Sequence, residues 1–369
     1  MVLFLLRLSL VNLIEIPSEL RKHTRGQALI CLIPPALQGM ERIERILEDI
    51  IRGEAVNDDG AGCVDYSIQD QLAELATKGV ESQCASDFRP VLMKNVTYIA
   101  GAVVFNDKGE VLLMQEAKVS CAGTWYLPAG RIEPGEQIIE AVRREVLEET
   151  GLEFQPQSLL CVETAKGSWF RFIFTGEIVG GKLKTVAEAD AESLQAAWVS
   201  DISSLSLRGK DIINVIDRAR QYFSDLNRVN FSLPAVKSHC KIYLRIVCII
   251  KKKLNNRVHL LISDKGYPHV PLSEINPTRS VHTALKRFMN HVFTNDPPPH
   301  KPHGVLSIEH DGTPIHANDG LCLSVLVSCK NCLEEVSLCP SYTWLEISTE
   351  LADRLQTKIK PHKIAALTV

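Results

Sequence analysis

Residues 130–152 read GRIEPGEQIIEAVRREVLEETGL and are the most informative stretch of the chain. Apolar side chains recur at every fourth residue, Ile138, Val142 and Val146, and this spacing places them on one face of a helix. Gly151 follows, and glycine readily adopts the left-handed conformation that ends helices. The stretch therefore predicts a loop and then an amphipathic helix whose apolar face packs on a sheet.

The same helix carries three glutamates, Glu145, Glu148 and Glu149, at positions i, i+3 and i+4. Like charges at this spacing repel, by roughly 0.2–0.5 kcal/mol for each pair. A hard divalent cation such as Mg²⁺ would relieve the repulsion between converging carboxylates. A solvated acidic helix face would explain the three glutamates equally well, so the rest of the stretch has to decide.

The whole stretch matches the Nudix box, G-x5-E-x7-R-E-U-x-E-E-x-G-U with U apolar, at every fixed position. Those positions are Gly130, Glu136, Arg144, Glu145, Val146, Glu148, Glu149, Gly151 and Leu152. A match by chance is expected on the order of once in 10⁸ starting points at ordinary residue frequencies. The segment therefore resembles the Nudix hydrolases, whose box is a loop–helix–loop on an α/β/α sandwich with a mixed sheet.

The resemblance implies an enzyme that hydrolyses phosphorus anhydrides of nucleoside diphosphate derivatives with Mg²⁺, for which Mn²⁺ can substitute. It implies that the Gly130 carbonyl, Glu145, Glu148 and Glu149 bind the metal. Glu148 and Glu145 would be catalytic, and Arg144 would orient a catalytic glutamate. Arg144 also reads as a simple helical partner of Glu140 or Glu148. The expected reaction is in-line attack of water on phosphorus, assisted by a box glutamate.

The context of the box narrows the resemblance. Four segments resemble the branch that acts on 8-oxo-guanine nucleoside diphosphates: VLLMQEAK (111–118), TWYLPAGRIEPGE (124–136), GSWFRFIF (167–174) and EADAESLQAAW (188–198). This implies hydrolysis of 8-oxo-dGDP and 8-oxo-GDP to the monophosphate and phosphate. Such an activity would sanitise the nucleotide pool and prevent DNA damage.

Three residues are candidates for substrate binding. Asp190 and Glu192 could accept a hydrogen bond from N7–H of the oxidised base, which guanine lacks, because a mispaired buried polar group is costly. One of them could instead complete the metal site or activate water, and an exposed acidic loop is an equally good reading. Leu112 is expected to contact the substrate by resemblance, although core packing fits a strand leucine equally well.

Two other functions remain open at this point. A Nudix pyrophosphatase for another diphosphate, such as ADP-ribose or a nucleotide sugar, would carry the same box. A non-catalytic nucleotide-binding regulator would not need an intact box. A panel of substrates would distinguish the first alternative from hydrolysis of 8-oxo-guanine nucleoside diphosphates. The intact box argues against the second alternative.

The rest of the chain predicts a second, degenerate Nudix-like domain. An offset of 143 residues aligns Pro128 with Pro271 and Pro134 with Pro277, and the strand and helix patterns repeat in the same order. We expect residues 1–39 to be an extension, 40–93 a helical arm and linker, 94–228 the catalytic domain and 235–369 the second copy. The helix of the arm is expected to carry Ile43, Leu47 and Ile50 on one apolar stripe. Coincidence between two α/β units is the alternative.

At the same offset the second copy lacks the acidic residues of the box. Ser273, Arg279, Phe288, His291 and Val292 stand where the first copy has Gly130, Glu136, Glu145, Glu148 and Glu149. The second domain is therefore expected to lack chemistry and to pack on the first, shape its cleft or mediate a homodimer.

Bulk composition bounds the partners. The net charge of −3 over 369 residues argues against a broad basic field for duplex nucleic acid. The apolar start, MVLFLLRLSLVNLIEI, is broken by Arg7 and is too short to span a membrane; a cleaved signal, or a start at Met40, are alternatives. Eleven scattered cysteines predict free thiols and a cytoplasmic location, with a nuclear or mitochondrial share left open. The expected partner is a small nucleoside diphosphate.

Overall fold

The computed structural model describes residues 35–57, 63–81 and 83–368. Most of the extension expected at residues 1–39 therefore lies outside the described residues. Contacts divide the chain after Arg42, so both large sheets belong to one unit, Ile43–Val369.

The helices are α2 (Pro35–Arg52), α3 (Ile68–Thr77), α4 (Ile138–Thr150), α5 (Asp211–Ser224), α6 (Val281–Val292) and α7 (Thr349–Ile359). The strands of the first half are β1 (Thr97–Ala102), β2 (Val111–Glu116), β3 (Trp125–Tyr126), β4 (Ala129–Arg131), β5 (Leu152–Lys166), β6 (Trp169–Gly181) and β7 (Ser193–Val199). Those of the second half are β8 (His239–Lys251), β9 (Val258–Ser263), β10 (Leu272–Glu274), β11 (His300–Glu309), β12 (Asp319–Cys332), β13 (Tyr342–Glu346) and β14 (Ala366–Thr368).

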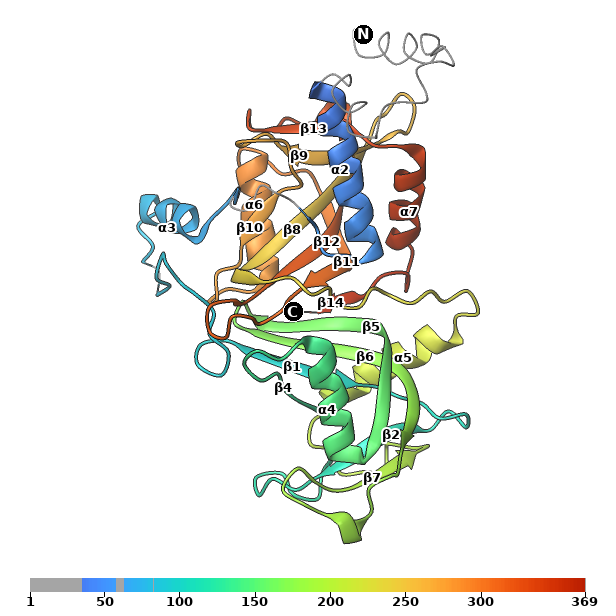
Figure 1. The fold of residues 1–369 in the computed structure, drawn as a ribbon. Coiled ribbons are helices and arrows are strands. Elements are labelled where there is room, and N and C mark those ends of the chain that lie inside the picture. The colour runs from blue at the N-terminus through green and yellow to red at the C-terminus, as the bar shows by residue number, and fades with distance from the viewer. Residues whose placement is uncertain (1–34, 58–62, 82, 369) are drawn as a thin grey trace, which may run out of the picture. The chain divides into compact units, whose positions relative to one another are not determined.

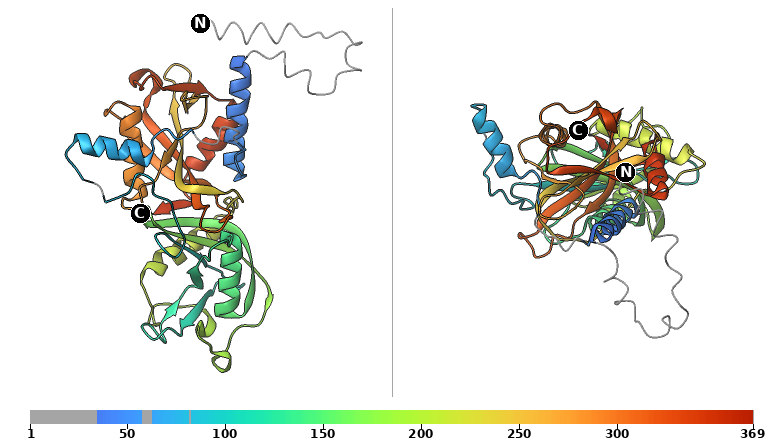
Figure 2. Two further views of the ribbon diagram at one scale, coloured as in Figure 1. Left: turned by 60° about the vertical axis from the view of Figure 1, so that its left-hand side comes forward. Right: turned by 90° about the horizontal axis from the view of Figure 1, so that it is seen from above.

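The first sheet is mixed and has the order β14-β5-β6-β1-β4. Strand β1 runs parallel to β6 and antiparallel to β4, while β2 pairs with β3 and β7 in a separate small sheet. Helices α4 and α5 cover opposite faces of the first sheet (Figures 1 and 2). The predicted apolar stripe of α4, residues Ile138, Val142 and Val146, is fully buried. The predicted α/β/α sandwich is therefore confirmed.

The second sheet repeats this topology. Strand β8 runs parallel to β12 and antiparallel to β10, as β1 does with β6 and β4, and β11 lies beside β12 as β5 lies beside β6. Adding 143 to the bounds of β4 gives residues 272–274, those of β10, and adding it to residue 138 gives 281, where α6 begins. The predicted Nudix-like second domain is thus present in the fold.

Both faces of the second sheet are covered. Alternating residues of β8 face two different cores: Ile246 belongs to the core beneath α6, and Val247 to a core with α2 and α7. Ile43, Leu47 and Ile50, the predicted apolar stripe of α2, are buried in this latter core. Helix α2 therefore serves as an outer layer of the second domain.

Two C-terminal elements were not predicted, the helix α7 and the strand β14. Strand β14 runs parallel to β5 of the first sheet over Cys161–Glu163. Just before it, Ala365 pairs with Val305 of β11 in the second sheet. The end of the chain thus lies between equivalent strands of the two sheets and joins them.

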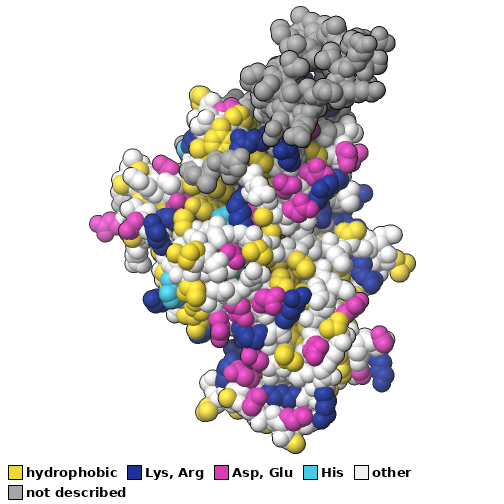
Figure 3. Space-filling view, viewed as in Figure 1, with side chains coloured by type: hydrophobic (Ala, Val, Ile, Leu, Met, Phe, Trp, Pro, Cys, Tyr) yellow, Lys and Arg dark blue, Asp and Glu magenta, His cyan; other side chains and the backbone are white. Residues whose placement is uncertain are grey.

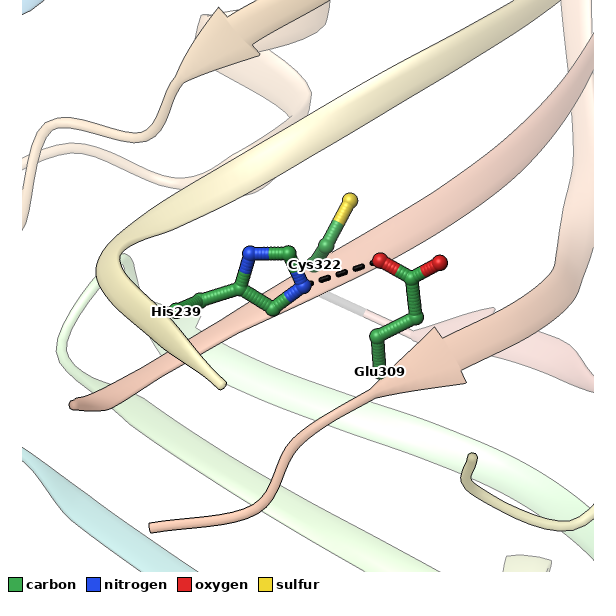
Figure 4. A group of neighbouring side chains, drawn as sticks. All are labelled: His239, Glu309 and Cys322. Atoms are coloured by element: carbon green, nitrogen blue, oxygen red, sulfur yellow. Dashed lines mark hydrogen bonds and ion pairs between the residues drawn. The ribbon is translucent and has the colours of Figure 1, made fainter. Parts of the chain in front are cut away.

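A buried ion cluster lies in the second domain (Figure 4). The carboxylate of Glu309 has no exposed surface, receives two hydrogen bonds from Arg245 at 3.2 and 3.1 Å, and lies 2.8 Å from Nε2 of His239. The sulfur of Cys322 completes the group, but burial raises the pKa of this thiol to about 12, which keeps it protonated. Because Arg245 already neutralises Glu309, the group acts as an internal ion pair.

Cysteines are free thiols throughout the described segments, as predicted. Cys248 and Cys329 approach most closely, with their sulfurs 3.7 Å apart. No described helix is long and apolar enough to cross a membrane. On the face shown in Figure 3, acidic and basic side chains are interspersed, in keeping with the small net charge.

Candidate catalytic site

The site begins where β4 passes under α4. Gly130 pairs with Ala100 of β1, and a Cβ placed on Gly130 would lie 2.1 Å from the carboxylate atoms of Glu145. The carboxylate of Glu145 therefore rests directly on the backbone of Gly130. Any larger residue would occupy that space, which gives a physical reason for glycine at the first position of the box.

Glu149 is the most deeply buried of the three helical glutamates, with 1% of its surface exposed. One oxygen accepts a 2.8 Å hydrogen bond from the amide of Ala129. Burial raises the pKa of Glu149 well above its ordinary value, against that hydrogen bond, and the neighbouring carboxylates of Glu145 and Glu116 add to the rise. The pKa of Glu145 is also raised, first by burial, with Glu148 and Glu192 contributing.

Arg144 links three of the box glutamates by hydrogen bonds. Its Nε and Nη2 donate to the two oxygens of Glu136 at 2.7 and 2.9 Å, and Nη2 also donates to the carbonyl of Arg131. Its Nη1 donates to Glu145 at 2.7 Å and to Glu148 at 3.1 Å. Of its two predicted helical partners Glu148 is present, whereas Glu140 pairs with Arg143 instead. Arg144 thus fixes the carboxylate of Glu145, and Glu136 fixes Arg144.

Glu148 differs from its neighbours because 44% of its side chain is exposed. Among the described residues, the one set of three potential ligand atoms within 4.8 Å of each other is His239, Glu309 and Cys322. The box carboxylates therefore converge less closely than their helical spacing predicts. Glu145 and Glu148 both accept a hydrogen bond from Nη1 of Arg144, whereas Glu149 accepts one from the amide of Ala129.

The donor set nevertheless fits Mg²⁺. Carboxylates next to a backbone carbonyl are hard oxygen ligands, which this ion prefers. The charge of Glu145 lies close enough to Glu149 to raise the pKa of Glu149, and a divalent cation would offset that unfavourable charge. Glu148 and the Gly130 carbonyl are the other two groups that the resemblance implies as ligands.

Comparisons with known proteins agree with this geometry. The NUDIX domain family matches residues 97–205. The chain is 36% identical over 324 residues to the 8-oxo-dGDP phosphatase NUDT18 of Danio rerio, which covers 84% of this chain and 91% of that protein. This chain is a Nudix hydrolase. Its identity to the Homo sapiens 8-oxo-dGDP phosphatase NUDT18 is 40% over 243 residues, covering 64% of this chain and 74% of that protein.

The structure separates the roles of the two acidic loop residues near this Nudix helix. Asp190 accepts from Lys184 at 2.7 Å and from the amides of Glu192 and Ser193, and the bond from Lys184 lowers its pKa. Lys184 in turn donates to the carbonyl of Glu148. Asp190 therefore fastens the loop to the end of α4, whereas the carboxylate of Glu192 lies near enough to Glu145 to raise its pKa.

Leu112 lies in β2 opposite Trp198 and has no exposed surface. Of the two readings that the sequence leaves open, the geometry favours core packing. A substrate would reach this leucine only after the surrounding side chains had moved.

Glu116, at the end of β2, was missed by sequence reasoning. It is 1% exposed and pairs with Arg208, but its Oε2 has no hydrogen-bond partner among the residues that the structure describes. Its charge contributes to the raised pKa of Glu149. A signal was present, since strand alternation places Glu116 on the same face as Leu112 and Met114, but the tertiary structure is needed to place it near α4. The free oxygen is an acceptor available to a cation or to a donor on a substrate.

Proposed function

We propose that this Nudix hydrolase cleaves 8-oxo-dGDP and 8-oxo-GDP to the monophosphate and phosphate in the presence of Mg²⁺. The observation that carries the proposal is the packing of the Glu145 carboxylate on the backbone of Gly130, near the buried carboxylate of Glu149. Similarity to two 8-oxo-dGDP phosphatases over most of their length supports the choice of substrate.

In this proposal Glu145, Glu148, Glu149 and the Gly130 carbonyl hold the metal. The ion, when bound, supplies positive charge against the diphosphate. Glu148 is the box carboxylate most open to solvent, so we assign to it the acceptance of a proton from the attacking water. Water adds to phosphorus as the P–O bond to the leaving group breaks, and Arg144 keeps Glu145 and Glu148 in place.

Discrimination of the oxidised base would need an acceptor for its N7–H, since guanine presents an acceptor at that position. We assign this role to Glu116 or Glu192: Oε2 of Glu116 has no hydrogen-bond partner among the described residues, and the charge of Glu192 contributes to the raised pKa of Glu145. Asp190 is already committed to Lys184, so we assign it the positioning of the loop.

We also propose that residues 94–228 form the catalytic domain and residues 235–369 the second, non-catalytic domain. The repeated strand topology supports this division. Ser273 and Phe288 at the positions of Gly130 and Glu145 support the lack of chemistry in the second domain.

The test is product release with Mg²⁺ from 8-oxo-dGDP, dGDP, 8-oxo-dGTP and ADP-ribose, measured side by side with the full chain by chromatography, because cleavage of ADP-ribose yields AMP and ribose 5-phosphate and no free phosphate. Preferential release from 8-oxo-dGDP is expected. Cleavage of ADP-ribose in preference to all three would move the enzyme to another Nudix substrate class. An inactive Glu148→Gln variant of unchanged thermal stability serves as the control for contaminating phosphatases.

A further inference from the structure

The two domains exchange contacts in a reciprocal way. We name residues 132–137, between β4 and α4, the catalytic loop, and residues 275–280, between β10 and α6, the silent loop. The β5–β6 connection turns at residues 167–168, and its counterpart, the β11–β12 connection, spans residues 310–318. Each of these connections lies against the loop of the other domain.

The first of these contacts is made by Gly167. Its amide donates a 2.6 Å hydrogen bond to the carbonyl of Arg279 in the silent loop. A Cβ placed on Gly167 would lie 2.3 Å from the carbonyl oxygen of Asn276. The hairpin of the first domain therefore touches the silent loop backbone to backbone, and only glycine fits there.

The second contact is made by Gly312 and Ile315. A Cβ on Gly312 would lie 3.4 Å from the Cα of Gly135 and 3.5 Å from the carbonyl oxygen of Glu136. A Cβ on Gly135 would lie 2.9 Å from Cγ1 of Ile315. The β11–β12 connection of the second domain thus packs on the backbone of the catalytic loop.

The two contacts are equivalent by position. Glu136 and Arg279 are related by the offset of 143 residues that relates the two domains, and each lies under the hairpin of the other domain. The pairing of the segment 365–368 with both β5 and β11 extends the same relation, because those strands are equivalent in the two sheets. The second domain therefore lies where a second copy of the first would lie in a reciprocal dimer.

This contact bears on the catalytic site through a short chain of interactions. The carboxylate of Glu136 accepts two hydrogen bonds from Arg144, and Arg144 donates to Glu145 and Glu148. The catalytic loop itself is a tight turn, in which the amide of Glu133 donates to the carboxylate of Glu136 and Gly135 has a φ of +84°. Displacement of Gly135 or Glu136 would therefore be passed to the metal-binding carboxylates.

We propose that the segment Gly312–Ile315 of the second domain is a positioning element for the catalytic loop, so that the non-catalytic copy holds the active one in its working geometry. The inference rests on the proposed assignment of the box residues and deepens it. It gives the second domain a role that needs neither its own chemistry nor a second chain.

The test removes the contact and leaves the box intact. Ile315→Ala deletes the atoms that touch Gly135, and Ile315→Val keeps Cγ1 and serves as the conservative rescue. Leu254→Ala, which truncates an exposed aliphatic side chain in the β8–β9 connection, is the matched control. Because 56% of Ile315 is exposed, its truncation is expected to leave the melting temperature nearly unchanged.

We expect Ile315→Ala to lower kcat roughly three- to tenfold with little change in KM, since a misplacement of about 1 Å can cost up to about a hundredfold. We expect Ile315→Val and Leu254→Ala to keep the rate of the wild type. Mg²⁺ affinity, measured by calorimetry without substrate, should weaken in Ile315→Ala alone. That readout stays valid if 8-oxo-dGDP proves not to be the substrate. Unchanged kcat and unchanged Mg²⁺ affinity in Ile315→Ala would overturn the inference.

Discussion

Replacement of Gly130 by alanine is the sharpest test of the site. The added Cβ would lie 2.1 Å from the carboxylate of Glu145, whereas ordinary contact begins near 3.4 Å. The carboxylate must therefore move by at least 1.3 Å, the difference between these distances. A displacement of about 1 Å in a catalytic arrangement can cost about a hundredfold in rate, or roughly 2.7 kcal/mol. We expect kcat/KM to fall by about that factor or more.

The assay is steady-state phosphate release over a range of Mg²⁺ concentrations, together with thermal unfolding. The Mg²⁺ midpoint should rise in Gly130→Ala because Glu145 no longer lies beside the carbonyl of residue 130. Overpacking should lower stability by about 1–3 kcal/mol at most, since Glu145 lies at the edge of the site. The matched control is Gly39→Ala in helix α2, where a Cβ meets no described atom within 4 Å apart from its chain neighbours and its own helix backbone. A Gly130→Ala enzyme with wild-type kcat/KM and an unchanged Mg²⁺ midpoint would refute the assigned role of this contact.

Three further predictions follow from the same geometry. Arg144→Lys should lower kcat about tenfold or more, because lysine cannot bind Glu136 through two parallel hydrogen bonds and reach Glu145 at the same time. Stopped assays at saturating Mg²⁺ would measure this loss, and a wild-type kcat in the variant would contradict the prediction. Burial alone would raise the pKa of Glu309, but the charge of Arg245 and the hydrogen bond with His239 hold it far below the ordinary value of 4.5. The ionised Glu309 therefore contributes its full stabilisation of the fold above about pH 4.5, and this stabilisation is lost as the pH falls toward the lowered pKa. In urea unfolding at pH 7, the free energy of unfolding of Glu309→Gln should be lower than that of the wild type by roughly 3–5 kcal/mol, and the difference should be smaller near pH 4. Deletion of residues 366–369 should lower the melting temperature and promote self-association, because β5 would become an uncovered edge strand. Gel filtration and thermal unfolding would test this, and an unchanged elution volume and melting temperature would show that β14 is dispensable.

Local periodicity was sufficient to predict most of the helices and strands. The apolar stripes of α2 and α4 repeat every three or four residues, and both are buried as predicted. Helix α7 and strand β14 were not predicted. Three residues are too few to show an alternation, and β14 forms only because β5 and β11 lie on either side of it.

The offset of 143 residues explains why the second domain could be recognised and why the match fades. The offset is kept from β4 to α4 because the loop between them has the same length in both copies. Beyond α6 it grows, since β5 begins at Leu152 and its counterpart β11 at His300, a difference of 148. Connections lie at the surface and tolerate insertions, so alignment by a constant offset ends at the first long one.

From the sequence, helical spacing places Glu145, Glu148 and Glu149 close together on one helix, and the resemblance of the whole box implies the chemistry. The sequence also shows that, at the offset of 143 residues, the second copy lacks those carboxylates. The tertiary structure was needed to show that Glu145 rests on Gly130 and that Arg144 donates hydrogen bonds to Glu136, eight residues away. It was also needed to place Glu116 beside the site. Only the tertiary structure brought Ile315 to Gly135. Such contacts depend on how strands and loops distant in the chain are packed together, and helical or strand periodicity carries no information about that packing.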